Sequence, residues 1–142
     1  MQNVQPGEYG VSNEPDQADL ALALPGLETV IGQQIGGQLS VMPHKDFSTE
    51  VRLELVRRES VYYGDGNLKE TTLPFKLAGN TQFVAGQPQA SPFQVVIPPD
   101  APPSIETPHG QITWRIKGIL ARRLRQDTLV EQEILVYPAR EG

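Results

Sequence analysis

The alternation of apolar and polar residues in short runs is the feature that most restricts the fold of this chain. In the clearest run, Val51, Leu53 and Leu55 point to one side. Arg52 and Glu54 lie between them and point to the other side. A period of two residues is that of a β-strand, whereas a helix repeats about every 3.6 residues. Such runs recur about seven times between turn-forming Gly, Pro, Asn and Asp residues, which predicts an all-β fold of about seven antiparallel strands.

The runs expected to form strands share this alternation and cover residues 18–24, 35–41, 49–63, 68–79, 92–98, 110–120 and 129–138. Pro74 lies inside the fourth run. Because proline has no N–H to donate to a ladder, that strand is expected at a sheet edge or at a bulge. The best helical candidate, residues 121–135, has only a partial helical period. β-Branched and aromatic residues such as Val130, Ile134 and Tyr137 favour a strand there, so no helix is expected.

A proline-rich segment, residues 98–104, separates two of these runs. A connection that crosses from one sheet to another needs length and stiffness, and prolines supply both without unpaired N–H donors. The segment therefore predicts two packed sheets, an immunoglobulin-like β-sandwich. Trp114, the single tryptophan, alternates with Ile112 and Ile116 in the run that follows, which places its indole in the core between the sheets.

Several short motifs, in order along the chain, resemble the arrestin-like β-sandwich family, in particular its bacterial sporulation-control type. The matching residues are Gly32, Gly37, Leu39, Val41, Phe93, Ile97, Pro98, Pro102, Pro103, Ser104, Gly110, Ile112, Trp114, Glu131, Glu133, Ile134 and Val136. Members of this family pair two sandwiches, whereas this chain has room for one. The resemblance implies a non-catalytic protein–protein interaction or scaffold module of the bacterial arrestin-like type.

Length and composition agree with one domain. The 142 residues are divided into an expected flexible N-terminal arm (1–17), an arrestin-like sandwich (18–138) and a tail (139–142). The chain has no cysteine, which excludes disulfides and thiolate sites. The net charge of -5 argues against nucleic-acid binding. With no signal peptide and no run long enough to span a bilayer, we expect a cytoplasmic protein.

The sequence has no convincing catalytic or metal-binding constellation. His44 and His109 both lie beside proline in expected loops, and their spacing matches no metal-binding motif. A nucleophilic arrangement of Ser104, His109 and Asp100 lacks the strand–turn–helix elbow of serine hydrolases. We therefore expect no enzyme, no cofactor and no metal, and we interpret Ser104 as a turn residue that bonds to nearby backbone.

Two groups of arginines and a pair of tyrosines are the candidate partner-binding residues: Arg57, Arg58, Tyr62, Tyr63, Arg122, Arg123 and Arg125. A shared basic patch would suit an acidic peptide or a membrane headgroup surface. The favoured alternative is pairing of the arginines with acidic residues on facing strands, such as Glu131 and Glu133. Because Tyr62 and Tyr63 are adjacent, they point to opposite faces of a strand.

The partner is expected to be another protein or a second copy of this chain, bound through a sheet edge or through the loops at one end. The alternative is a small-ligand or carbohydrate-binding module, with aromatics such as Tyr62, Tyr63 or Phe83 on a sheet face. Exposed coplanar aromatics would favour this alternative, and buried ones would oppose it.

Overall fold

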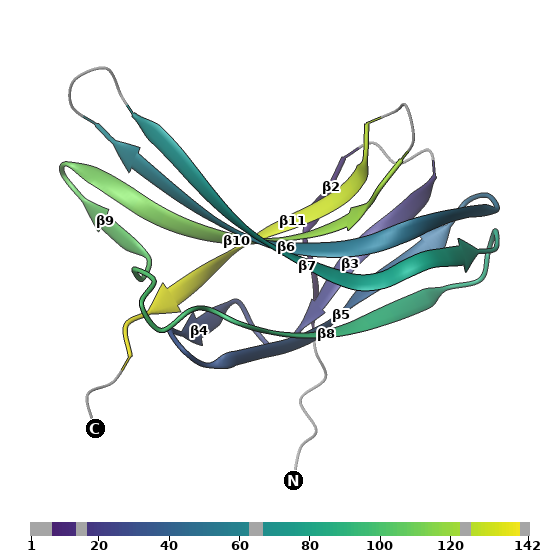
Figure 1. The fold of residues 1–142 in the computed structure, drawn as a ribbon, viewed down its shortest axis with the longest axis horizontal. Coiled ribbons are helices and arrows are strands. Elements are labelled where there is room, and N and C mark those ends of the chain that lie inside the picture. Colours follow the sequence, from purple (N-terminus) through teal and green to yellow (C-terminus); the bar gives the residue numbers. More distant parts are fainter. Residues whose placement is uncertain (1–6, 14–16, 63–66, 123–125, 140–142) are drawn as a thin grey trace, which may run out of the picture.

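Two packed β-sheets make up the computed structural model of this chain, which describes residues 7–13, 17–62, 67–122 and 126–139 (Figure 1). In these ranges the chain forms eleven strands and no helix, so no helical span could cross a membrane there. The strands are β1 (Gly7–Tyr9), β2 (Val11–Ser12), β3 (Ala18–Leu24), β4 (Glu28–Val30), β5 (Gln34–Pro43), β6 (Phe47–Val61), β7 (Leu68–Phe83), β8 (Gln89–Val96), β9 (Ile105–Thr107), β10 (Gly110–Leu120) and β11 (Thr128–Tyr137).

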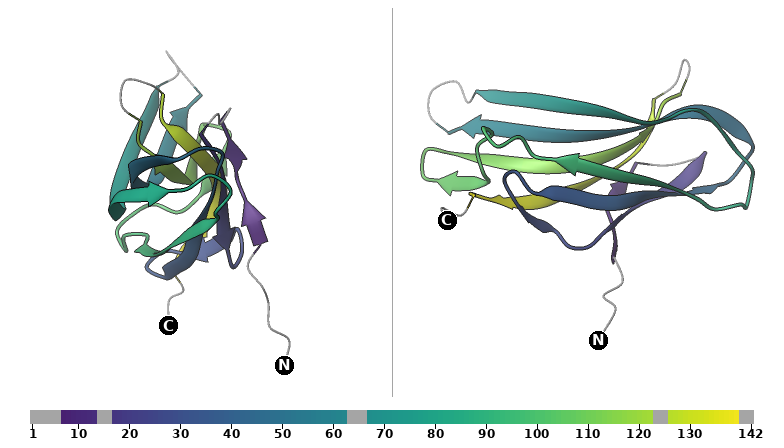
Figure 2. Two further views of the ribbon diagram at one scale, coloured as in Figure 1. Left: turned by 90° about the vertical axis from the view of Figure 1, so that its right-hand side faces the viewer. Right: turned by 60° about the horizontal axis from the view of Figure 1, so that its bottom comes forward.

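The smaller sheet has four strands in the order β1-β3-β5-β8. The larger sheet follows the order β2-β11-β10-β6-β7, with β9 added beside β10 and β4 added beside β11. All these pairings are antiparallel except that of β4 with β11. Figure 2 shows the two layers from one end of the molecule. The fold is therefore the expected all-β sandwich.

The seven long strands are the seven that the alternation predicts, and the four additional strands have only two or three residues. Such short segments carry too little pattern to be recognised. The loop expected over residues 80–91 was too long: residues 89–91 begin β8, and residues 80–83 extend β7. Phe83 is fully buried there and stacks on Phe47 with ring centroids 4.9 Å apart. Burial of this aromatic pair, which the local pattern does not reveal, keeps β7 in the sheet.

The expected flexible arm is also corrected within its described residues. Strand β1 pairs with β3, and β2 pairs with β11. Next to β2, the Asn13 side chain accepts a hydrogen bond from the Leu129 N–H and donates one to the Asp127 carbonyl. Backbone pairing and one bridging amide hold this segment, and Tyr9 packs against the core. A prediction from apolar content therefore missed it.

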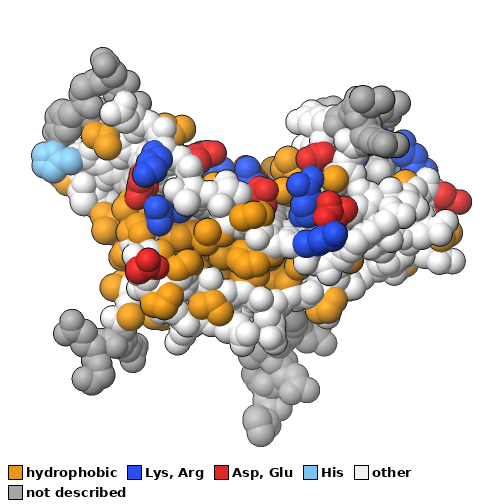
Figure 3. Space-filling model, in the orientation of Figure 1, with side chains coloured by type: hydrophobic (Ala, Val, Ile, Leu, Met, Phe, Trp, Pro, Cys, Tyr) orange, Lys and Arg blue, Asp and Glu red, His pale blue; other side chains and the backbone are white. Residues whose placement is uncertain are grey.

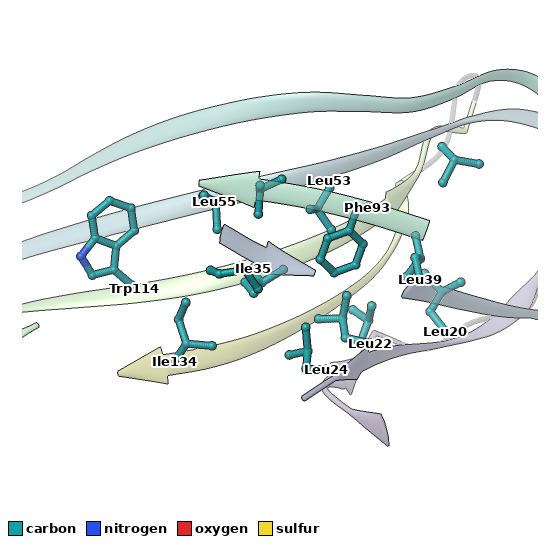
Figure 4. Packing of buried hydrophobic residues seen from close by; sticks show 14 of the residues in the cluster. Leu20, Leu22, Leu24, Ile35, Leu39, Leu53, Leu55, Phe93, Trp114 and Ile134 are labelled. Carbon is teal, nitrogen blue, oxygen red and sulfur yellow. The ribbon is translucent and has the colours of Figure 1, made fainter. Parts of the chain in front are cut away.

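The core lies between the inner faces of the two sheets, and Figure 4 shows Leu, Ile and Phe side chains from both meeting there. Trp114 lies at one end of this cluster and is only 1% exposed, as predicted. The proline-rich segment crosses from β8 in the smaller sheet to β9 and β10 in the larger sheet. Its Pro102 carbonyl accepts a hydrogen bond of 3.0 Å from Trp114 Nε1. The crossing segment therefore covers the indole and closes this end of the core.

Proline interrupts both long edge strands. Strand β7 ends the larger sheet and contains Pro74, which confirms the prediction of an edge position. Strand β8 ends the smaller sheet and contains Pro92. The strands on the opposite side, β1, β2 and β4, are only two or three residues long. Mid-strand prolines and very short edge strands both limit the addition of a further strand.

Candidate functional site

Paired charges cover the outer face of the larger sheet. Arg115 Nη1 lies 3.1 Å from Glu131 Oε1, and Lys117 Nζ lies 3.7 Å from Glu131 Oε2. Arg58 pairs with Thr113 on β10, and Thr113 is in phase with Arg115 and Lys117, so Arg58 lies on the same face. In Figure 3, blue and red side chains lie next to one another on the upper part of the molecule. Cross-strand pairing, the favoured interpretation of these charges, is therefore present in the structure.

Arg58 makes a close ion pair with the neighbouring edge strand. Its Nε and Nη2 atoms donate to the same oxygen of Glu70, at 3.0 and 2.7 Å. The hydrogen bond from Arg58 lowers the pKa of the Glu70 carboxyl below its usual value. Because both side chains are partly exposed, screening by solvent keeps the contribution of this pair to stability small.

Arg57 points to the opposite face of β6 and lies over the Trp114 ring, with its guanidinium carbon 5.9 Å from the ring centroid. Its Nε lies 3.5 Å from Glu59, and its Nη2 donates weakly to Thr71 at 3.4 Å. Arg57 and Arg58 therefore do not share one basic patch. Their adjacency in sequence places them on opposite faces of the strand.

Of the second group of arginines, the structure describes only Arg122. Arg122 follows the end of β10, where Leu120 pairs with Val51 near the start of β6. Seven residues of strand separate Val51 from Arg58, a distance of roughly 23 Å. The Arg122 N–H donates to Asp127 Oδ1 at 3.0 Å. Arg123, Arg125 and Tyr63 lie outside the described residues. The structure thus separates Arg122 from Arg57 and Arg58.

One end of the larger sheet extends past the smaller sheet, and we call it the projecting end (Figures 1 and 2). It consists of the end of β6, the start of β7, the whole of β9 and the start of β10. On the inner face of β6, burial falls from the buried Leu55 to the partly buried Arg57 and then to Val61, which is 48% exposed. The core face of the sheet therefore continues here without a covering layer.

Exposed apolar side chains gather on this projecting end. Gly110 pairs with Val61, Ser60 pairs with Leu68, and Ile112 pairs with Ile105. The Tyr62 N–H donates to the His109 carbonyl beside them. The apolar residues concerned are Val61, Tyr62, Leu68 and Ile105, which are 48%, 50%, 59% and 42% exposed. Of these, the sequence singled out only Tyr62. Val61 is in phase with the buried Val51, Leu53 and Leu55, so it resembles a core residue until the sheet is seen to extend past its partner.

The two histidines lie at opposite ends of β6. His44 comes just before this strand and lies 3.2 Å from Asp19, whereas His109 precedes Gly110, the partner of Val61 at its far end. The 15 residues of β6 separate these ends by roughly 45 Å. Across the residues that the structure describes, no group of three or more His, Asp or Glu side chains is arranged to hold a metal. The geometry therefore removes the metal-pair hypothesis.

Ser104 has a different role from the one predicted. Its Oγ accepts a hydrogen bond of 2.9 Å from the Val136 N–H, and its own N–H donates to the Val136 carbonyl. Ser104 therefore attaches the crossing segment to β11, 32 residues away in sequence, rather than bonding to nearby backbone. These bonds are non-local, so the prediction from local turn chemistry was wrong.

The carbohydrate alternative loses one of its three aromatics. Phe83 is fully buried in the core, and Tyr63 lies outside the described residues. Tyr62 is exposed, and Tyr137, also exposed, donates to Glu28 at the other margin of the larger sheet. That hydrogen bond raises the pKa of the Tyr137 hydroxyl. Of the three aromatics proposed to contact a carbohydrate, Tyr62 is therefore the one that the structure describes as exposed.

Comparison with known proteins agrees with this architecture. No curated protein matches the chain. Among solved structures, the sporulation control protein Spo0M from Bacillus subtilis is similar, with a TM-score of 0.73 and 20% sequence identity. The similarity covers 87% of this chain and 50% of the Spo0M chain, so this chain spans about half the length of Spo0M. At this identity, the likeness concerns the fold.

A family model matches the sequence itself. The model of the arrestin (or S-antigen) N-terminal domain matches residues 56–140. This range contains the crossing segment, Trp114 and the last strands, which carried the later motifs of the resemblance. Because the matched range is more than half of the 142 residues, the chain belongs to the arrestin family.

Proposed function

We propose that this chain is a non-catalytic protein-interaction module that binds its partner through the projecting end of the larger sheet. The observation behind the proposal is the uncovered continuation of the core face, where Val61 and Ile105 are exposed. Leu68, the partner of Ser60, is exposed on the opposite face at the same end of the sheet. When a partner covers such apolar surface and removes it from water, binding becomes more favourable by about 25 cal/mol for each Å² buried.

The edges of the sheets are less suitable for binding by strand addition. Pro74 and Pro92 interrupt the two long edges, and the other edge strands have only two or three residues. An added strand would find a short run of free backbone groups at each edge. Of the two binding modes expected from the sequence, the end of the sandwich is therefore the one that the structure supports.

The charged residues near this end are better suited to orienting a partner than to increasing its affinity. Arg58 is already engaged by Glu70, and Arg57 lies against Trp114 and Glu59. A partner that approaches Val61 and Ile105 on the core face meets Arg57 at the margin of this surface, whereas Arg58 lies on the opposite face. Charges at the rim of an interface mainly affect the rate and the orientation of association. Arg57, Arg58 and Tyr62 thus remain candidate partner-binding residues.

The test is a binding experiment with two valine variants. Val61→Ser removes apolar surface from the projecting end, and Val84→Ser removes it from an exposed valine in the β7–β8 connection, at 38% exposure against 48% for Val61. Proteins captured from a lysate of the source organism by the wild-type chain are identified by mass spectrometry. We expect Val61→Ser to lose at least one specific protein that Val84→Ser retains.

Thermal unfolding of both variants establishes that each is folded. If both folded variants capture the same proteins as the wild type, the projecting end is not the binding surface.

A further inference from the structure

The outer face of the smaller sheet differs from that of the larger sheet in its charge. Of the 12 Lys and Arg and 17 Asp and Glu residues of the chain, strands β1, β3, β5 and β8 carry only Glu8 and Asp19. Both lie toward one margin, where Asp19 pairs with His44. The outer face of the larger sheet, by contrast, is covered with ion pairs.

The register shows which side chains form this uncharged surface, which we call the neutral face. Across the sheet, Ala21 pairs with Ser40 and Ser40 pairs with Ala90. In the next rows, Gln38 lies between Ala23 and Pro92, and Gly36 pairs with Gln94. These positions alternate with Leu22, Leu39 and other buried residues, so they all point away from the core.

The neutral face is hollowed rather than filled by long side chains. One hollow of about 420 Å³, on the side of the sheet that carries Glu8 and Asp19, is lined by these two residues and by Ala21, Ser40, Met42 and Ala90. A second of about 400 Å³ lies over Gly36, Pro92 and Gln94. A methyl group added at Gly36 would meet only the Phe93 carbonyl, at 4.0 Å. A second sheet can therefore approach this face closely.

We infer that the neutral face is the contact by which two copies of this chain pair, sheet against sheet. The inference does not depend on binding at the projecting end. The net charge of -5 opposes association of two copies, but the centre of this face brings no charge into the contact. Burial of an unpaired charge is the main penalty in such packing, and here both anions lie at the margin.

The chemistry of the face is self-complementary. Each glutamine amide both donates and accepts, so a glutamine of one copy can bond to a glutamine of the other. Gln34 and Gln94 already show this pairing within one chain, with Nε2 of the first donating to Oε1 of the second at 3.0 Å. Met42, 39% exposed, and Val96, 42% exposed, add apolar surface near the two ends of the face. Charged faces, by contrast, repel their own copies unless their signs are arranged in register.

The size of the face predicts a weak dimer. Strands β3, β5 and β8 have seven, ten and eight residues, and β1 has three, so at about 3.3 Å per residue and about 4.8 Å between strands they cover roughly 450 Å² per copy. Two copies would then bury roughly 900 Å², close to the lower limit of about 1,000 Å² for a specific interface. We expect a concentration-dependent equilibrium with a dissociation constant in the micromolar range rather than an obligate dimer.

Sedimentation velocity between about 5 and 500 µM tests this inference, because a micromolar equilibrium changes the average mass over this range. The Gln38→Glu variant places one like charge from each copy in the contact and should raise the dissociation constant about tenfold or more. Gln126→Glu makes the same chemical change in the exposed β10–β11 connection and should leave the equilibrium unchanged. A monomeric wild type over the whole range, or equal dissociation constants for the two variants, would overturn the inference.

A single introduced cysteine locates the contact, because the chain has no other. Ser40→Cys, in the middle of the neutral face, should form a disulfide-linked dimer on mild oxidation, whereas Thr72→Cys on β7 should not. Preferential cross-linking through Thr72→Cys would place self-association on the larger sheet instead and overturn the inference. A monomeric Gln38→Glu variant that still captures a partner would leave the proposed function intact, so the two proposals fail separately.

Discussion

Replacement of Trp114 by phenylalanine tests whether the crossing segment closes the core. The indole is 1% exposed, and its Nε1–H donates to the Pro102 carbonyl at 3.0 Å. Phenylalanine preserves an aromatic ring at the same position but cannot donate this hydrogen bond. The variant therefore separates attachment of the crossing segment from the general requirement for a large apolar side chain.

The expected loss has two main parts. Removal of the hydrogen bond, which leaves the Pro102 carbonyl without its partner, costs about 1 to 1.5 kcal/mol. Phenylalanine is smaller than tryptophan by about 40 Å³, and a cavity penalty of about 24 cal/mol per Å³ adds about 1 kcal/mol. The stacking of Arg57 over the ring adds a few tenths of a kcal/mol at most. The free energy of unfolding should fall by about 2 kcal/mol, which for a domain of this size lowers Tm by roughly 7 °C.

Urea unfolding followed by far-UV circular dichroism measures this difference, because the variant no longer contains a tryptophan to report fluorescence. The Ser104→Ala variant provides a second measure of the same segment. It removes the acceptor of the Val136 N–H and should cost about 1 kcal/mol. In the wild type, acrylamide should quench the single tryptophan poorly because the indole is buried.

A Trp114→Phe variant that loses less than about 0.5 kcal/mol would refute this reasoning, because neither part of the expected loss would then be present. Efficient quenching of the wild-type indole by acrylamide would lead to the same conclusion. Either result would mean that the crossing segment does not cover the core at this point.

Two further predictions use matched positions. A β-carbon at Gly37 would lie 2.5 Å from the Ala23 carbonyl oxygen, whereas one at Gly36 would meet only the Phe93 carbonyl oxygen, at 4.0 Å. In urea unfolding, Gly37→Ala should therefore lower the free energy of unfolding by about 1 to 3 kcal/mol, and Gly36→Ala by less than about 0.5 kcal/mol. Equal costs would show that the strands do not approach as closely as described. Pro74→Thr restores an N–H to the edge strand and should increase aggregation on heating, measured by light scattering, because it removes an obstacle to edge-to-edge pairing. Unchanged scattering would show that proline does not protect this edge.

The sequence predicted the features that depend on local pattern. Alternation identified all seven long strands, because each strand has one face in the core and the other in water. Pro74 indicated an edge strand, because proline cannot donate to a ladder. Trp114 was expected in the core because it alternates with Ile112 and Ile116. The short strands were missed because two or three residues carry no measurable period.

The candidate site was predicted less well, because a surface brings together residues that are distant in sequence. Arg57 and Arg58 were grouped, yet they point to opposite faces of β6. Phe83 was considered a ligand-contacting aromatic, yet it stacks on Phe47 in the core. Whether an apolar residue near a strand end is buried depends on how far the opposite sheet extends, and no local pattern contains that length.

By itself, therefore, the sequence determined the strand class, the edge position of Pro74, the crossing of the proline-rich segment and the place of the indole. These follow from side-chain periodicity and from the restricted chemistry of proline. Only the tertiary structure decided that the larger sheet extends beyond the smaller one, leaving Val61 and Ile105 exposed, and that one outer face is charged while the other is neutral. The physical reason is that exposure and charge pairing depend on which strands become neighbours, and strand order is set by packing of the whole chain.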